Sequence, residues 1–294
     1  MNSSQRILAL DVFRGMTISL MILVNNPGTW AHVYAPFRHA KWHGCTLTDL
    51  VFPFFLFIAG TAMRFSLGKV KFCRCKDVYV KIFWRAVTIF AFGILLNAFP
   101  FIRQDWDWSH FRIMGVLQRI GIAYGIGAFL VLRFSFKQLW GVIFSTLVGY
   151  WIILWGFGGP APFSLENNMV RMIDLTILGE SHLWTGTRIP FDPEGLFSTL
   201  PAIATLLMGY MAGVMIHTAV DMNENVKKMF ISGGIQIVAG LVWSLAFPLN
   251  KSLWTSSYVL FTAGLASIIL AGLIWCIDLK GIKKIFWRSE ERRV

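Results

Sequence analysis

Eight long apolar runs are the feature of this sequence that most limits its fold. A helix needs about 20 mostly apolar residues to cross a bilayer, and each run approaches or reaches that length. We therefore predict an all-α, polytopic transmembrane helix bundle of about eight spans. The predicted spans cover residues 7–25, 49–67, 82–100, 113–132, 139–157, 197–216, 229–247 and 257–277.

The composition supports a membrane protein and excludes other classes. Charged residues make up 14% of the chain, whereas a soluble domain carries roughly 25%. The net charge of +12 does not indicate nucleic-acid binding, because the basic residues lie in short connections between apolar runs. The cysteines lack the second pair that a zinc site needs, and they imply no disulfide framework. We expect neither a metal nor a nucleic-acid partner.

The distribution of lysine and arginine predicts the orientation. One set of connections collects 16 of these residues and the other set collects 7, and the richer set is expected in the cytoplasm. Both termini are then cytoplasmic, and the 26–48 loop faces outward. The first span carries charges and lacks a small-residue cleavage site, so we expect it to be retained. We predict one integral-membrane domain over 1–280 and a basic cytoplasmic tail over 281–294.

Polar residues inside the first span are expected to face a partner or a cavity, since charges within a bilayer are costly. Asp11 and Arg14 are three residues apart and share a helix face. Asn25 follows Arg14 by eleven residues, almost three full turns, and returns to that face. The three residues predict either the wall of a pathway or, for Asp11 and Arg14 alone, a structural ion pair.

The fourth predicted span carries Arg112 and Arg119, seven residues apart and so on one face. A buried arginine needs an anion, which Asp11, Asp49 or a bound phosphate could supply. The interpretations left open are contact with an anionic cofactor and an internal salt-bridge network. A basic connection, 69–81, either enforces topology and touches anionic lipid or receives cofactor phosphates.

The residues from 38 to 60 place titratable and aromatic side chains directly before a span. The 26–48 loop holds His32, His39 and His43, and imidazole can remove a proton from an attacking amine or hydroxyl. An amide such as Asn25 can hold an acyl carbonyl or its developing oxyanion. Asp49 is interpreted either as a helix cap or as the group that orients His39.

The connection 158–196 is unusually long, and long ordered loops are often functional. Its five carboxylates against two arginines make it acidic, and four prolines stiffen it. It predicts either an outward cap for a cationic or hydroxyl-rich ligand, or an ordinary solvated loop.

Six blocks together resemble the heparan-α-glucosaminide N-acetyltransferase family of transmembrane acyltransferases, as found in its bacterial relatives. They occur in the family's order and cover nearly the whole chain, although family members usually continue for two or three further spans, so we expect a shortened C-terminus. The blocks are LDVFRGM (10–16), MILVNNPG (21–28), RHAKWHGCTLTDLVFPFFLFIAG (38–60), GVLQRIGIAY (115–124), FDPEGLFSTLPAIATLLMGYMAG (191–213) and PLNKSLWTSSYVLFTAG (248–264).

The resemblance implies transfer of an acetyl group from cytosolic acetyl-CoA to an amino sugar or oligosaccharide across the bacterial inner membrane. The family's active-site histidine and asparagine match His39 and Asn25. The assembly is left open between a monomer and a homodimer. The expected site comprises catalytic His39, Asn25 and Asp49; acetyl-CoA contacts Arg14, Arg119, Lys69, Lys71 and Arg74; substrate contacts His43, Trp42, Asp192 and Glu194; and the ion pair Asp11–Arg14.

Two other functions fit the same residues. A permease for amino sugars or N-acetylated sugars would also use intramembrane charges, but no inverted repeat or pair of broken helices is visible. A membrane-embedded partner of an envelope-polysaccharide machine would need no chemistry of its own.

Overall fold

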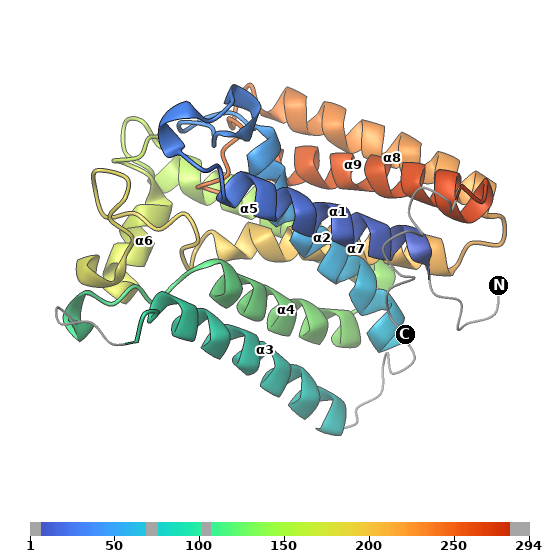
Figure 1. The fold of residues 1–294 in the computed structure, drawn as a ribbon, viewed down its shortest axis with the longest axis horizontal. Helices are drawn as coiled ribbons and strands as arrows, with labels where there is room; N and C mark the ends of the chain where they lie inside the picture. The colour runs from blue at the N-terminus through green and yellow to red at the C-terminus, as the bar shows by residue number, and fades with distance from the viewer. Residues whose placement is uncertain (1–6, 69–75, 102–106, 283–294) are drawn as a thin grey trace.

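The structure, a computed structural model, describes residues 7–68, 76–101 and 107–282. Within these ranges it is all-helical, and eight helices are long and apolar enough to cross a membrane (Figure 1). This confirms the predicted multi-pass helix bundle. The long helices are α1 (Leu8–Asn25), α2 (Leu47–Leu67), α3 (Lys76–Asn97), α4 (Val116–Arg133), α5 (Phe136–Phe157), α7 (Thr199–His217), α8 (Met222–Trp243) and α9 (Ser256–Leu273), the last extended by the π-helix η6 (Ile274–Leu279).

Helix α7 is the centre of the bundle, with 83% of its spanning window buried, whereas the figure for α3 is 11%. Its contact with α2 is close because glycines replace side chains there. A Cβ atom on Gly209 would lie 2.0 Å from the Phe57 carbonyl oxygen. The Thr61 hydroxyl also reaches the Gly209 carbonyl at 3.0 Å. Small residues that let backbones approach are a usual basis of helix packing in membranes.

Helices α8 and α9 form one edge of the bundle, and α3 and α4 form the other (Figure 1). The N-terminal end of α1 lies beside the C-terminal end of η6, since Ala9 N donates to Asp278 Oδ2 at 3.4 Å. The long connections gather at the opposite end, on the left of Figure 1, which we call the loop end. It comprises residues 26–46, the described parts of 98–115, residues 158–198 and residues 244–255.

Two local predictions differ from the structure. The segment 158–196 is not only a loop, because it contains helix α6 (Met169–Leu178), whose N-cap Asn168 accepts from Arg171 N at 2.8 Å. Arg112 does not lie on the fourth span, because α4 begins at Val116. The side chain of Asn97 donates to the Arg112 and Met114 carbonyls at 3.0 and 3.2 Å, which holds that segment out of the helix.

Candidate functional site

The loop that carries His39 is fixed by hydrogen bonds to distant parts of the chain. Gly44 N donates to the Leu249 carbonyl at 2.8 Å, and Gly44 adopts φ +115°, a conformation that favours glycine. The Trp42 indole donates to the Phe163 carbonyl at 2.7 Å. These bonds join the loop to the α8–α9 connection and to the 158–198 segment, so His39 has a defined position.

Asp49 serves both roles that its sequence position suggested. It closes the N-terminus of α2 in a capping box with Thr46. Its Oδ2 accepts from Thr46 N and Ala40 N, at 3.1 Å each, while its Oδ1 lies 2.7 Å from His39 Nδ1. The carboxylate side chain is only 2% exposed, whereas that of His39 is 53% exposed. A buried acid therefore holds an accessible imidazole.

This geometry determines how His39 can react. A carboxylate accepts hydrogen bonds, so Nδ1 carries the proton and donates to Asp49. The other ring nitrogen, Nε2, is then the free acceptor. Lys251 completes the group, with its Nζ 3.6 Å from Asp49 Oδ1 and 3.2 Å from His39 Nδ1. Its positive charge stabilises the ionised carboxylate.

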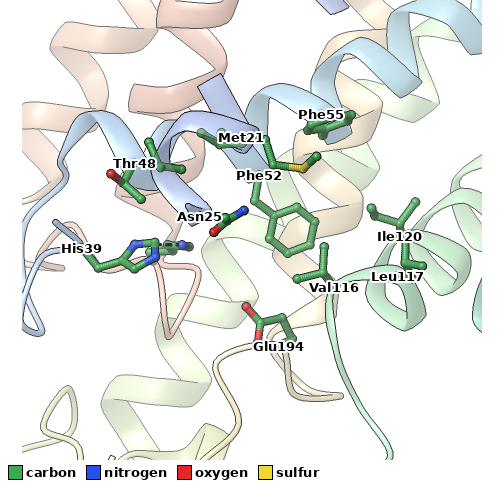
Figure 2. Close-up of a pocket in the computed structure, with 13 residues that line it drawn as sticks. Met21, Asn25, His39, Thr48, Phe52, Phe55, Val116, Leu117, Ile120 and Glu194 are labelled. Carbon is green, nitrogen blue, oxygen red and sulfur yellow. Dashed lines mark hydrogen bonds between the residues drawn. The ribbon is translucent and has the colours of Figure 1, made fainter. Parts of the chain in front are cut away.

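An apolar cavity of about 440 Å³ lies between α1, α2 and α4 and reaches His39 (Figure 2). Most of its wall is hydrophobic, and Asn25 and Glu194 extend polar groups into it, as Figure 2 shows. The hydrophobic part is formed by Met21, Val24, Val51, Phe52, Phe55, Val116, Leu117 and Ile120.

A second, more polar cavity of about 410 Å³ lies at the loop end. It shares His39, Glu194 and Lys251 with the apolar cavity. The rest of its wall includes Trp42, Asp49, Arg112 and Trp184. His39 therefore stands in the wall common to an apolar cavity and a polar cavity.

Asp192 and Glu194 are held by Arg112 and not by a group from another span. The Arg112 guanidinium binds Asp192 through two hydrogen bonds of 2.8 and 2.7 Å, and it donates to Glu194 Oε2 at 2.8 Å. Burial alone would lower the pKa of Arg112, but the two carboxylates raise it above its usual value. The anions that bind Arg112 are therefore two carboxylates 80 and 82 residues further along the chain, a contact that helical phase could not show.

The structure brings together five of the predicted site residues: His39, Asn25, Asp49, Trp42 and Glu194 each line at least one of the two cavities. Two others lie apart. Asp192 is fully buried, and its carboxylate is bound by Arg112. His43 lies 3.4 Å from the Asn250 amide and lines neither cavity.

The two predicted acetyl-CoA contacts that the structure describes, Arg14 and Arg119, line neither cavity. Arg14 is paired with Asp11 at 3.4 Å, which agrees with the predicted ion pair. Arg119 is fully buried and donates to the carbonyls of Pro193 and Gly195 and to the Ser198 hydroxyl. That geometry favours an internal structural role, and its contact with a cofactor stays a prediction. Three further predicted contacts, Lys69, Lys71 and Arg74, lie outside the described residues.

Sequence reasoning missed Lys251 and the role of Arg112. From the sequence, Lys251 is a cation in a connection between two spans, inside the block PLNKSLW. Helical phase predicts a helix face for Arg112, whereas the structure shows Arg112 binding the carboxylates of the acidic segment. The available signal was that Lys251 lies in a family block and that Arg112 lies close to Arg119 in the sequence. Only the folded chain shows what the two residues contact.

The fold and the site together define a multi-pass membrane protein with a histidine–carboxylate pair between two cavities. Residues 6–249 match the family described as heparan-alpha-glucosaminide N-acetyltransferase, catalytic. The chain therefore belongs to this family.

Two curated relatives are similar over most of this chain. Heparan-alpha-glucosaminide N-acetyltransferase from Mus musculus is 29% identical, with 96% of this chain and 51% of the relative aligned. The protein of the same name from Homo sapiens is 28% identical, with 94% and 50% aligned. The chain thus spans about half the length of these relatives.

Proposed function

We propose that this protein is a transmembrane acetyltransferase that moves an acetyl group from acetyl-CoA to the amine of a glucosamine-type sugar. The observation that carries the proposal is the position of His39, which has Nδ1 bound to Asp49 and stands in the wall shared by the two cavities. The names of the relatives support the donor and acceptor classes.

The two cavities suit the two substrates. The apolar cavity between α1, α2 and α4 fits the thioester end of the donor, and the Asn25 amide can donate to the thioester carbonyl there. The polar cavity fits the sugar, because the Glu194 carboxylate, bound by Arg112 through Oε2, can also accept from the amine or hydroxyl groups of the sugar. The acceptor nitrogen and the acetyl carbon would then meet beside His39.

The chemistry follows from the free nitrogen of His39. The neutral sugar amine attacks the acetyl carbonyl carbon, and its proton passes to Nε2. The carbon–sulfur bond breaks as the amide bond forms, and the imidazolium returns the proton to the coenzyme A thiolate. Asp49 keeps the imidazole in the required tautomer throughout.

A transient acetyl-histidine is the other route that this geometry permits. In that route Nε2 attacks the thioester carbonyl carbon and the coenzyme A thiolate leaves. The sugar amine then attacks the acetyl carbon, the bond to Nε2 breaks, and the amine proton passes to solvent. Acetyl-labelled acetyl-CoA supplied without acceptor separates the two routes. Direct transfer leaves the protein unlabelled, whereas the carrier route labels it stoichiometrically and His39→Ala abolishes the label.

The proposed orientation places the loop end in the periplasm of a bacterial inner membrane. It rests on the excess of lysine and arginine in the connections at the other end. The basic segment that includes Lys69, Lys71 and Arg74 would then meet the phosphates of cytosolic acetyl-CoA.

The test uses proteoliposomes with labelled acetyl-CoA on one side and glucosamine on the other. His39→Ala should lower the rate of N-acetylglucosamine formation by about 10²–10⁴-fold, the usual contribution of a general base. His32→Ala is the matched control, because His32 is an exposed histidine of the same loop that lines neither cavity.

Two outcomes would contradict the proposal. One is a folded, inserted His39→Ala protein that works at the parental rate. The other is uptake of labelled glucosamine by the same vesicles without acetyl-CoA and without acetylation, which would indicate the permease.

A further inference from the structure

A third cavity, of about 540 Å³, adjoins the polar cavity at the loop end. The two share Arg112 and Trp184 in their walls. We call the third one the distal cavity, since His39 does not line it. Its volume lies within the range of about 300–1,000 Å³ that is usual for small-molecule sites.

The wall of the distal cavity is held in place by the fold. His182 Nδ1 donates to the Phe111 carbonyl at 2.7 Å, and Phe191 N donates to the Trp184 carbonyl at 3.0 Å. Leu183, between them, is buried. The backbone on both sides of Trp184 is therefore fixed, while the indole itself is 39% exposed.

Trp184, together with Arg112, lines both cavities where they adjoin. The Arg112 guanidinium carbon lies 5.8 Å from the centre of the Trp184 ring, an interaction that orients the indole. An indole presents a broad apolar surface, and the C–H face of a pyranose ring packs well on such a surface. A sugar bound beside His39 would thus have an aromatic platform at its far end.

The polar groups of the distal cavity are those that bind sugar hydroxyls. Ser181 and Thr185 offer hydroxyls, and Glu180 offers a carboxylate. Among the described residues, no cation forms an ion pair with Glu180. The carboxylate is therefore available to accept hydrogen bonds from hydroxyl or ammonium groups.

Among the described residues, the charged groups of this wall and their ion-pair partners carry a net negative charge. Arg112 is a cation of its wall, but it is already bound to two carboxylates, Asp192 and Glu194. His110 also lines the cavity, and its Nδ1 lies 2.6 Å from Asp107 Oδ2. Because none of the described cations pairs with Glu180, a second carboxylate or a sulfate bound here would meet repulsion.

We infer that the distal cavity binds a second glycosyl unit of the acceptor, and that this unit is neutral or carries an amine. The acceptor is then an oligosaccharide whose terminal glucosamine lies beside His39 and whose next unit lies beyond Trp184. This inference rests on the proposed acetyltransferase function, and it adds a discrimination against acidic second units.

The experiment compares three kinds of acceptor: glucosamine, glucosaminyl-glucosamine disaccharides with α1,4 and β1,4 linkages, and glucosaminyl-glucuronic acid. For the parental protein, kcat/KM for at least one glucosaminyl-glucosamine should exceed that for glucosamine about tenfold. The glucuronic acid disaccharide should not exceed glucosamine. Failure of both diamino disaccharides to exceed glucosamine would overturn the inference.

A charge reversal tests the named residue. Glu180→Lys should lower kcat/KM for the preferred diamino disaccharide toward the glucosamine value and raise it for the glucuronic acid disaccharide. The value for glucosamine itself should stay within about twofold. Glu166→Lys is the control, because Glu166 is an exposed carboxylate of the same segment that lines none of the three cavities.

The outcomes separate this inference from the function on which it rests. If Glu180→Lys changes all acceptors equally or none of them, the distal cavity is not a sugar subsite, although acetylation of glucosamine still supports the acetyltransferase. If no acceptor is acetylated by the parental protein, the acetyltransferase function fails as well.

Discussion

Two histidine–aspartate pairs lie at the loop end, and their bond lengths are nearly the same. His39 Nδ1 lies 2.7 Å from Asp49, and His110 Nδ1 lies 2.6 Å from Asp107. Their surroundings differ. The Asp49 side chain is 2% exposed, while that of Asp107 is 54% exposed. The second pair also joins residues three apart, in one short turn.

The difference shows that a short bond does not by itself define a reactive group. Asp107 is a local acceptor for Ser109 and His110 in solvent, and hydrogen bonds from Ser109 and then His110 lower its pKa to about 2. Asp49 is fixed by the Thr46 N–H within the α2 capping box and by the Ala40 N–H outside it. Because Asp49 is fixed, its hydrogen bond also fixes His39, and the imidazole lines two cavities.

The largest effect should come from matched substitutions in the two acids. Asp49→Asn should lower acetylation of glucosamine by about 10²-fold. The amide oxygen can still accept from Ala40 N and Thr46 N, but its NH₂ group then faces His39 Nδ1. This turns Nδ1 into an acceptor, so Nε2 carries the proton and cannot act as a base.

Asp107→Asn should leave the rate for glucosamine within about twofold, because an exposed pair contributes little. Initial rates in proteoliposomes, with insertion checked for each variant, measure both. Equal losses of activity in Asp49→Asn and Asp107→Asn would mean that the buried pair is no more important for catalysis than the exposed pair.

A smaller effect should come from Lys251, the cation that lies beside the buried His39–Asp49 pair. Its Nζ lies 3.6 Å from Asp49 Oδ1, and its positive charge stabilises the ionised carboxylate that holds His39. In Lys251→Gln that stabilisation is lost. At about 4 Å in a water-like medium the interaction is about 1 kcal/mol, which corresponds to roughly a fivefold change in rate.

The kcat of Lys251→Gln for glucosamine should therefore fall about fivefold, while KM changes little. A rise in KM with kcat unchanged would indicate that Lys251 only binds substrate. Lys41→Gln is the control, because Lys41 also lines the polar cavity.

How much the sequence predicted can be seen in particular residues. Hydropathy found all eight spans, because the bilayer length sets a simple requirement. It misplaced the start of α8 by seven residues, since Asn223, Glu224 and the following lysines begin the helix in polar sequence. Helical phase could relate Asp11 to Arg14, but it could not relate Arg112 to Asp192, whose contact depends on how the 158–198 segment folds over the bundle.

The site was predictable to the same degree. His39 and Asn25 followed from a resemblance, and their gathering with Asp49 followed from short separations along the chain. The contribution of Lys251 depends on the meeting of two connections more than 200 residues apart. The cavities, and the sharing of His39 between two of them, are properties of packing that no motif encodes.

A third carboxylate, Asp174 of helix α6, extends the comparison to an acid that is buried without a histidine. Its Oδ1 accepts from Phe197 N at 3.1 Å, while its buried Oδ2 has no hydrogen-bond partner among the described residues. Burial raises the pKa of Asp174 to about 6. The folded state thus binds a proton more tightly than the unfolded state, in which an aspartate titrates near 4.

The sign of the pH effect follows from that difference. Stability should fall as the pH rises from about 4 to about 6, because the folded protein must then hold an ionised, poorly paired carboxylate. Asp174→Asn cannot titrate and should lose this dependence. Between pH 5 and pH 7.5 this linkage amounts to about 1.4 kcal/mol. The Tm of the parental protein in detergent should therefore fall by about 3–5 °C relative to the variant, given about 2–4 °C per kcal/mol for a domain of 150–250 residues.

The exposed acid supplies the control for this smallest effect. The pKa of Asp107 is about 2, so its titration lies below the tested range and Asp107→Asn should follow the parental curve between pH 5 and pH 7.5. If Asp174→Asn also follows the parental curve, then Asp174 is ionised and accommodated at neutral pH. Its surroundings would in that case resemble those of Asp49, where bonds to fixed donors offset the burial of a charge.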